Sequence, residues 1–459
     1  MRAVAETPEG TVEAQIGEWR SFTRRRRELS GADTDELEDH LRARIDELSA
    51  AGLAPDEAFL VAVKRMGSLD SLTREFAREH SERLWKQLVL VGDGADEERA
   101  RGVGPMLLWA VVAAVAIKVP ALFGLSLDDD PTFYLLNGAL FGLAPLAAYL
   151  AHTRDTSRRA LALAGALFAA GAVVVNAYPL AEEAAVTVLA ALHLPIALWI
   201  AVGAVYADGD LPPGPRWMDF IRFTGEWVVY MALIALGGGV LTGLTVGGLE
   251  AAGVDAQVFV TQWMLPCGVV GAIVVAAWLV GAKQSVVENM APVLGKVFTP
   301  LFVVTLTGLV VAIVANGIDV DRDALILFDL VLAVVLGLIV YGISARDPLA
   351  PPAFFDRLQL GLVAATLVVD LLVLIALGRR LSEFGFSPNR TAALGENLVL
   401  LGNLGWSAWL LLAFIRGRAR FTLLETWQTR YVWVYAAWAW TVVVVFPLVF
   451  GFDATPRVF

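Results

Sequence analysis

The stretch MLLWAVVAAVAI, residues 106–117, decides the fold class of this chain. It is the first long apolar run, whereas residues 1–101 are rich in Arg, Glu and Asp. Similar runs follow almost to the C-terminus, and 57% of the chain is hydrophobic, with a mean hydropathy of +0.65. Soluble domains are about 45–50% apolar. The sequence therefore predicts a charged soluble domain, residues 1–101, followed by a transmembrane domain, residues 102–459.

The apolar runs predict the number of membrane crossings. A helix needs about 20 mostly apolar residues to cross a bilayer. We therefore predict an all-α, polytopic membrane protein with about eleven spans in contact with lipid. The predicted spans are residues 105–125, 133–151, 160–178, 184–206, 221–248, 257–281, 297–315, 324–344, 358–377, 392–415 and 431–451.

The charges between the spans predict the orientation. Cytoplasmic loops of membrane proteins carry an excess of Lys and Arg. With residues 1–101 inside, most remaining basic residues fall in cytoplasmic loops, and the opposite loops are acidic, as at 128–130 and 182–183. The abundance of Arg, Ala, Gly and Pro is typical of a GC-rich bacterial genome. We predict a multi-pass protein of a bacterial inner (plasma) membrane, with its N-terminus cytoplasmic and its C-terminus external.

The first domain reads as a set of short amphipathic helices. Apolar side chains recur every three or four residues over 33–51, which predicts a helix with one apolar stripe: Leu37, Leu41, Ile45 and Leu48. Two more helices are predicted over 55–66, where Pro55 suits a first turn, and from Ser68 onward. We expect these helices to fold without the transmembrane domain.

A family resemblance rests on three short motifs of this domain. They are Asp39-His40-Leu41, the run GLAPDEA at 52–58 and the run KRMG at 64–67. These motifs resemble the bacterial permease prefix domain, a helical module that precedes assorted transmembrane regions, including transporter permeases. The resemblance implies a cytosolic location and a contact with a cytosolic protein partner. It implies no enzymatic activity.

A second resemblance rests on the run GRRLSEFGFSPNR, residues 378–390, which puts three arginines in a predicted external loop. The loop is similar to the pattern Arg-x-x-Glu-Tyr-Gly-x-Thr-Pro-x-Arg of the family called domain of unknown function 4153. Phe384 and Ser387 replace the Tyr and Thr of that pattern. The similarity extends over about 220–415 and implies architecture rather than chemistry. The matching residues are Arg380, Glu383, Gly385, Pro388, Asn389 and Arg390.

Ionisable residues within the spans are the candidate functional residues, because a charge at mid-bilayer costs at least about 2.5–3.5 kcal/mol. Asp370 stands inside the apolar run AATLVVDLLV, residues 364–373, and Asp329, Glu396 and Glu226 lie nearer to span ends. These carboxyl groups are interpreted either as a polar path for a proton or cation, or as structural groups that pair helices, stay protonated or snorkel to the interface.

The surroundings of Asp370 lead to one structural expectation. A carboxylate turned toward lipid would lack any partner. We therefore expect Asp370 to face the protein interior and to pair with a polar group on a neighbouring span. The candidate partners are Asn397, Asn403 and Asp329.

Glycines in the fifth predicted span admit two interpretations. Gly239, Gly243 and Gly247 form two overlapping Gly-x-x-x-Gly steps. Such a face allows two helices to pack closely. It also fits a broken helix at a substrate site, as in many transporters.

Several classes of function are disfavoured by the sequence. It has no Walker A motif, no His-Glu-x-x-His and no Gly-x-Ser-x-Gly. The single cysteine, Cys267, stands in an apolar run with no His near it in sequence. The net charge is −11, and no basic face with interleaved aromatic residues suggests nucleic-acid binding. We predict a protein that is not an enzyme and uses no catalytic residue, cofactor, metal or nucleic acid.

Two functional classes remain. The first is a permease-like or channel-like transport protein whose polar path includes Asp370. The second is a membrane sensor or scaffold whose first domain binds a protein partner. Transport predicts a polar route or cavity between helices, and a scaffold predicts a tightly packed bundle.

Overall fold

Helices make up every regular element that the structure describes. The computed structural model describes residues 16, 31–50, 58, 62, 93–154, 156–251, 254–255, 257–282, 284–316 and 322–453. The predicted all-α class is therefore confirmed. The chain divides into two compact units, Met1–Asp96 and Glu97–Phe459.

The first unit contains helix α2 (Gly31–Ala50), which agrees with the helix predicted over 33–51. Leu41, Ile45 and Leu48 are buried, so these three residues of the predicted apolar stripe face a protein interior, and the Leu37 side chain lies outside the described part. The other two predicted helices lie outside the described residues, except that Ala58 and Ala62 are helical and buried.

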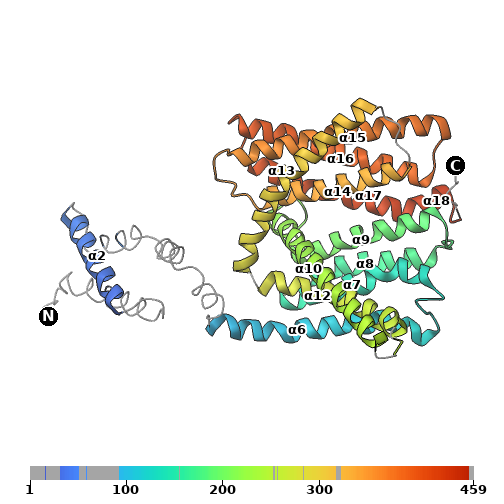
Figure 1. Cartoon of the computed structure of the whole chain (residues 1–459), viewed down its shortest axis with the longest axis horizontal. Coiled ribbons are helices and arrows are strands. Elements are labelled where there is room, and N and C mark those ends of the chain that lie inside the picture. Colours follow the sequence, from blue (N-terminus) through green and yellow to red (C-terminus); the bar gives the residue numbers. More distant parts are fainter. Residues whose placement is uncertain are drawn as a thin grey trace. The chain divides into compact units, whose positions relative to one another are not determined.

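The second unit consists of long apolar helices (Figure 1). In chain order these are α6 (Asp93–Lys118) with a 3₁₀ turn (Val119–Phe123), α7 (Pro131–Thr153), α8 (Arg158–Ala177), α9 (Ala185–Tyr206), α10 (Pro215–Ala251), α11 (Gln257–Phe259) with a π turn (Val260–Met264), α12 (Leu265–Ala282), α13 (Gln284–Asn316), α14 (Arg322–Ser344), α15 (Phe354–Phe384), α16 (Pro388–Ile415), and α17 (Thr422–Trp440) continued by a π turn (Thr441–Val445) and α18 (Phe446–Phe450).

These helices have the properties of membrane spans. Ten helical stretches among the described residues are long and apolar enough to cross a bilayer. Large apolar side chains also point outward, such as Leu122 at 82% exposure and Leu236 at 71%. Soluble proteins rarely expose large contiguous patches of apolar surface. The second unit is therefore a polytopic helical membrane domain whose apolar outer surface contacts lipid.

The seventh predicted span, 297–315, differs from the other ten. It corresponds to the apolar segment Val297–Ile313 of α13, which is shorter than those ten stretches. The helix itself is longer because it begins at Gln284 and continues through the polar residues that precede this segment.

Contacts between loops show which helix ends lie on the same side of the membrane domain. The α7–α8 turn meets the end of α9 through a 2.7 Å hydrogen bond from Ser157 N–H to Asp208. Arg222, near the start of α10, donates to the Ser344 carbonyl at the end of α14. We name this side the basic face. The opposite side, where Ala181 N–H donates to the Phe452 carbonyl, is the acidic face.

The two faces show the direction in which α13 passes through the membrane domain. The end of α12 lines one pocket with Asp208 and Arg222 and so lies at the basic face. Helix α14 ends at the basic face and therefore begins at the acidic face. Because α13 connects the end of α12 to the start of α14, it also crosses from the basic to the acidic face. Among the described residues, ten helical stretches are long and apolar enough to cross a bilayer, and α13 runs between the same two faces with a shorter apolar segment.

Two large apolar cores, with smaller clusters beside them, hold this unit together. The first gathers residues of α7, α9, α10 and α12, including Leu146, Leu194 and Val274. The second gathers residues of α14, α15 and α16, including Leu332 and Leu362. Contacts of α9 with α16 and α17, and of α10 with α14, join the two halves. Figure 1 shows α9 alongside α17 in this arrangement.

The glycine-rich segment of α10 matches neither interpretation of the sequence. Helix α10 continues without a break from Pro215 to Ala251, so the broken-helix interpretation is wrong. A Cβ atom added at Gly239, Gly243 or Gly247 would meet no atom within 4 Å in the part of the chain that the structure describes. Close packing against another helix of this chain is therefore not seen there either.

Candidate functional site

Asp370 lies near the middle of α15 and is completely buried, with 0% of its surface exposed. The expectation that it faces the interior is confirmed. Neither carboxyl oxygen of Asp370 has a hydrogen-bond partner among the described residues. An isolated charge buried in this way is unfavourable. We therefore take the Asp370 carboxyl group as the centre of the candidate functional site.

Asp329 of α14 is the acidic group that interacts electrostatically with Asp370. One of its oxygens accepts a 2.8 Å hydrogen bond from the Asn397 side chain of α16. The same Asn397 nitrogen donates to the Ala393 carbonyl, which fixes the amide orientation. Asn397 thus partners Asp329 and does not bond to Asp370. The expectation that Asp370 pairs with Asn397, Asn403 or Asp329 is therefore wrong, because neither Asp370 oxygen has a hydrogen-bond partner among the described residues.

Glu396 pairs with a residue of a different helix. Its Oε1 lies 2.7 Å from Nε2 of His193 on α9, without the alignment of a hydrogen bond. His193 is buried, and its Nδ1 lies 2.9 Å from the Leu189 carbonyl oxygen, to which it donates. This contact joins α9 to α16 through a histidine and a carboxyl group.

A polar network missed by the sequence analysis lies deeper in the same bundle. The Asn403 amide donates to Gln428 Oε1 at 3.0 Å, and the Gln428 amide donates to the Ser407 hydroxyl at 2.7 Å. Ser407 in turn donates to the Asn403 carbonyl at 2.7 Å. All three side chains are buried. Their spacing of four within α16 places Asn403 and Ser407 on one face, but only the fold brings Gln428 of α17 beside them.

The polar groups occupy successive depths of the bundle. At 1.5 Å per residue, Asp329 and Glu396 lie about 10–12 Å from the acidic-face ends of their helices, and Asp370 and Asn403 lie about 21–23 Å from theirs. Gln428 lies about 9 Å from the basic-face end of α17. We refer to these residues of α14–α17 as the polar line.

An ion pair ends this line near the basic face. Arg346 contacts both oxygens of Asp356 through Nε at 2.7 Å and Nη2 at 3.1 Å. Asp356 is almost completely buried and also accepts the Ala353 N–H at 2.7 Å. The Arg346 guanidinium lies over the ring of Phe421. This pair fixes the α14–α15 loop against the start of α17, and no spacing in the sequence predicted it.

The loop that resembles the 4153 family is mostly helical. Arg380 and Glu383 lie in the last turns of α15, and Pro388 and Asn389 begin α16. The loop itself is therefore limited to Gly385, Phe386 and Ser387. The predicted boundary was too early because α15 continues past its apolar segment through residues that remain compatible with helix.

Gly385 and Arg390 have identifiable structural roles. Gly385 ends α15 with a φ of 73°, a conformation that favours glycine. The Arg390 guanidinium donates to the Phe384 and Gly385 carbonyls, each at 3.1 Å, and so satisfies the end of α15.

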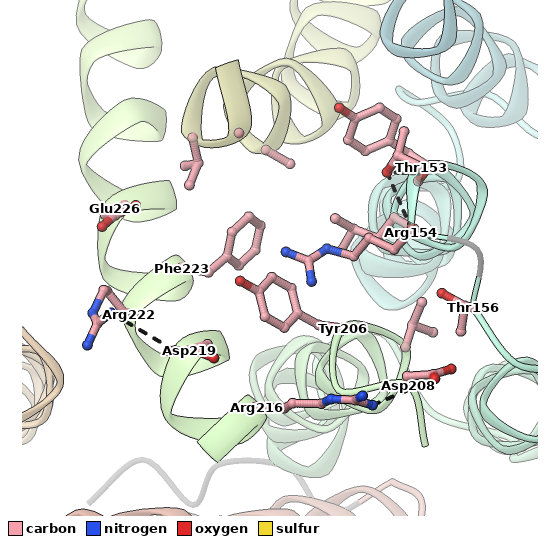
Figure 2. A pocket seen from close by; sticks show the side chains of 16 residues that line it. Thr153, Arg154, Thr156, Tyr206, Asp208, Arg216, Asp219, Arg222, Phe223 and Glu226 are labelled. Carbon is pink, nitrogen blue, oxygen red and sulfur yellow. Dashed lines mark hydrogen bonds and ion pairs between the residues drawn. The ribbon is translucent and has the colours of Figure 1, made fainter. Parts of the chain in front are cut away.

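Glu226 lies in a different place from the other three candidate residues. It lines a half-open pocket of about 690 Å³ at the basic face, between the ends of α7, α9 and α12 and the start of α10. Figure 2 shows this pocket with Arg154, Tyr206 and Phe223 near its centre. Asp370, Asp329 and Glu396 do not line it. The structure therefore separates Glu226 from the polar line.

The chemistry that the carboxyl group of Asp370 offers is proton exchange. Within the described residues, no group of three or more His, Cys, Asp or Glu side chains could hold a metal ion. Asp370, Asp329 and the His193–Glu396 pair each offer an atom that can accept or release a proton.

Comparison of this chain with protein-family models, with curated proteins and with solved structures finds no match. The resemblances to the permease prefix domain and to the 4153 family thus remain predictions that rest on the residues quoted above.

Proposed function

We propose that this protein is a permease-like or channel-like transport protein of a bacterial inner membrane, and that it moves protons through α14–α17. The observation that carries the proposal is the Asp370 carboxyl group, which is completely buried at mid-span with both oxygens unpartnered among the described residues. Ionisable residues within membrane spans commonly mark ion pathways and proton relays.

The order of the groups supports a proton as the transported ion. Protons would enter from the acidic face at Glu396–His193 and Asp329, and pass through Asp370 to the amide and hydroxyl groups of Asn403, Ser407 and Gln428. The two pockets described for this chain are lined by other residues. A proton can move between neighbouring polar groups and transient water, whereas a hydrated cation needs a wider cavity.

We propose further that the basic face is cytoplasmic, because its loops carry Arg154, Arg158 and Arg159, among others. The N-terminal unit then precedes the first crossing on the cytoplasmic side and contacts a protein partner there. The chain itself acts without enzymatic chemistry.

The packed surroundings of Asp370 favour a second candidate, a membrane sensor or scaffold. In that case Asp370 would serve packing or protonation sensing, and the first unit would pass the signal to a partner. Purified protein in vesicles distinguishes the two candidates, since only a transport protein carries ions without a partner.

The test is proton entry into vesicles that contain a pH-sensitive dye and are driven by a potassium diffusion potential. Wild-type vesicles should acidify, Asp370→Asn vesicles should acidify at least about tenfold more slowly, and Asp128→Asn should match the wild type. Asp128 is an exposed carboxylate in the α6–α7 loop and lies far along the chain from the polar line. Wild-type vesicles that behave like empty vesicles would refute transport of protons.

A further inference from the structure

The pocket at the basic face contains an arginine with no carboxylate partner among the described residues. Arg154, directly after α7, reaches into the pocket, and its guanidinium carbon lies 3.7 Å from the centre of the Tyr206 ring. Figure 2 shows the guanidinium pointing toward Phe223 of α10, above Tyr206. Arg154 also shares a side-chain hydrogen bond with Tyr206, and its guanidinium, which carries five N–H donors, keeps others for a ligand.

The other cations of the pocket are already engaged. Arg216 lies 3.6 Å from Asp208 and 3.4 Å from Asp210, and it donates to the Ala207 carbonyl. Arg222 donates to the Ser344 carbonyl and lies 4.0 Å from Asp219. Arg154 is therefore the cation of this lining that is available for a ligand.

The acidic groups of the pocket are held away from the Arg154 guanidinium. The hydrogen bond from Ser157 N–H and the nearby Arg216 hold the pKa of Asp208 below its usual range, so Asp208 is ionised and committed to these partners. In Figure 2, Glu226 lies on the far side of Phe223 from Arg154, and Asp219 lies beside Arg222. The space in front of Arg154 is therefore suited to an anion.

We propose that this pocket binds a phosphate group through Arg154. Arginine binds phosphate oxygens in a bidentate manner, and the two N–H groups at its edge match their spacing. The pocket lies where four apolar helices begin or end, and the ends of membrane-spanning helices are the parts that meet the headgroup region. The phosphate comes either from an anionic phospholipid or from a soluble phosphate compound. This site is independent of the proposed transport through Asp370.

The test uses full-length protein in non-ionic detergent, titrated with inorganic phosphate or with short-chain phosphatidylglycerol at constant ionic strength set with chloride. Heat-unfolding midpoints and ligand titration report binding. We expect saturable stabilisation by at least one of the two probes. A response to phosphate identifies a soluble ligand, and a response to phosphatidylglycerol alone identifies a lipid headgroup.

Two variants and one control make the test specific. Arg154→Gln should weaken binding at least about tenfold, and Arg154→Lys should weaken it less, because lysine keeps the charge but loses the planar edge. Arg158→Gln removes a nearby exposed arginine that does not line the pocket and should bind like the wild type. No saturable response in the wild type, or equal binding by Arg154→Gln, would overturn the proposal.

Discussion

The side-chain amide of Asn397 donates a 2.8 Å hydrogen bond to the Asp329 carboxylate and thereby joins α16 to α14 within the membrane domain. Asn397 is completely buried. Replacing it with Ala should destabilise the protein by about 1–3 kcal/mol, because the carboxylate loses its donor in a place where water is scarce. Unfolding in a denaturing detergent, followed by circular dichroism, measures this change.

A double-mutant cycle shows whether the effect comes from this one bond. Asp329→Ala and Asn397→Ala should together cost less than the sum of the single variants, by about 0.5–3 kcal/mol. Additive losses would mean that the two side chains do not interact.

The Arg346–Asp356 pair gives a larger expected effect. Asp356→Ala should destabilise the protein by about 3–5 kcal/mol, because it leaves the Arg346 guanidinium without its carboxylate in a largely buried site. Arg357→Ala changes the next residue, which is exposed, and serves as the control. Equal stability of the two variants would show that the pair does not hold the α14–α15 loop.

The contact between α16 and α17 requires a glycine at position 395. A Cβ atom at Gly395 would overlap the ring of Trp438, whereas a Cβ atom at Gly405, on the same helix, would meet nothing within 4 Å among described residues. Gly395→Ala should therefore destabilise by about 1–3 kcal/mol. Gly405→Ala should be neutral or stabilising by up to about 1 kcal/mol, because Ala favours helix. The heat-unfolding midpoint of Gly395→Ala should thus fall below that of the wild type, and the midpoint of Gly405→Ala should stay equal to it or rise.

The fold could be predicted largely from apolar runs. The runs place each crossing, and α10, α13 and α15 extend beyond their predicted spans because polar residues continue a helix outside the lipid. The glycines of α10 show the limit of such reasoning. Small residues permit close packing, but only the three-dimensional arrangement decides whether a neighbour is present.

The candidate site was predictable only in part. Asp370 stood out because it interrupts an apolar run, and its burial follows from the cost of a carboxyl group in lipid. The pairing of His193 with Glu396 joins residues that are about 200 positions apart, and no periodicity relates them. In the sequence, Glu226 is an acidic residue within a span, as the other candidates are. In the structure, it lines the pocket at the basic face.

The orientation can be tested with single cysteines in a Cys267→Ala background. Asp128→Cys is exposed at the acidic face, and Arg418→Cys is exposed between α16 and α17 at the basic face. A membrane-impermeant maleimide should label position 128 in intact cells and position 418 only after the membrane is opened. The reverse pattern would invert the proposed orientation.

The rate of potential-driven proton entry into vesicles containing the Asp370→Asn, Asp370→Glu and wild-type proteins tests the central claim most directly. Asp370→Glu retains a carboxyl group, whereas Asp370→Asn retains the shape of the side chain without one. The account predicts proton entry for the wild type, partial entry for Asp370→Glu and at least about tenfold slower entry for Asp370→Asn when all three are folded. Equal rates for the wild type and Asp370→Asn would contradict it.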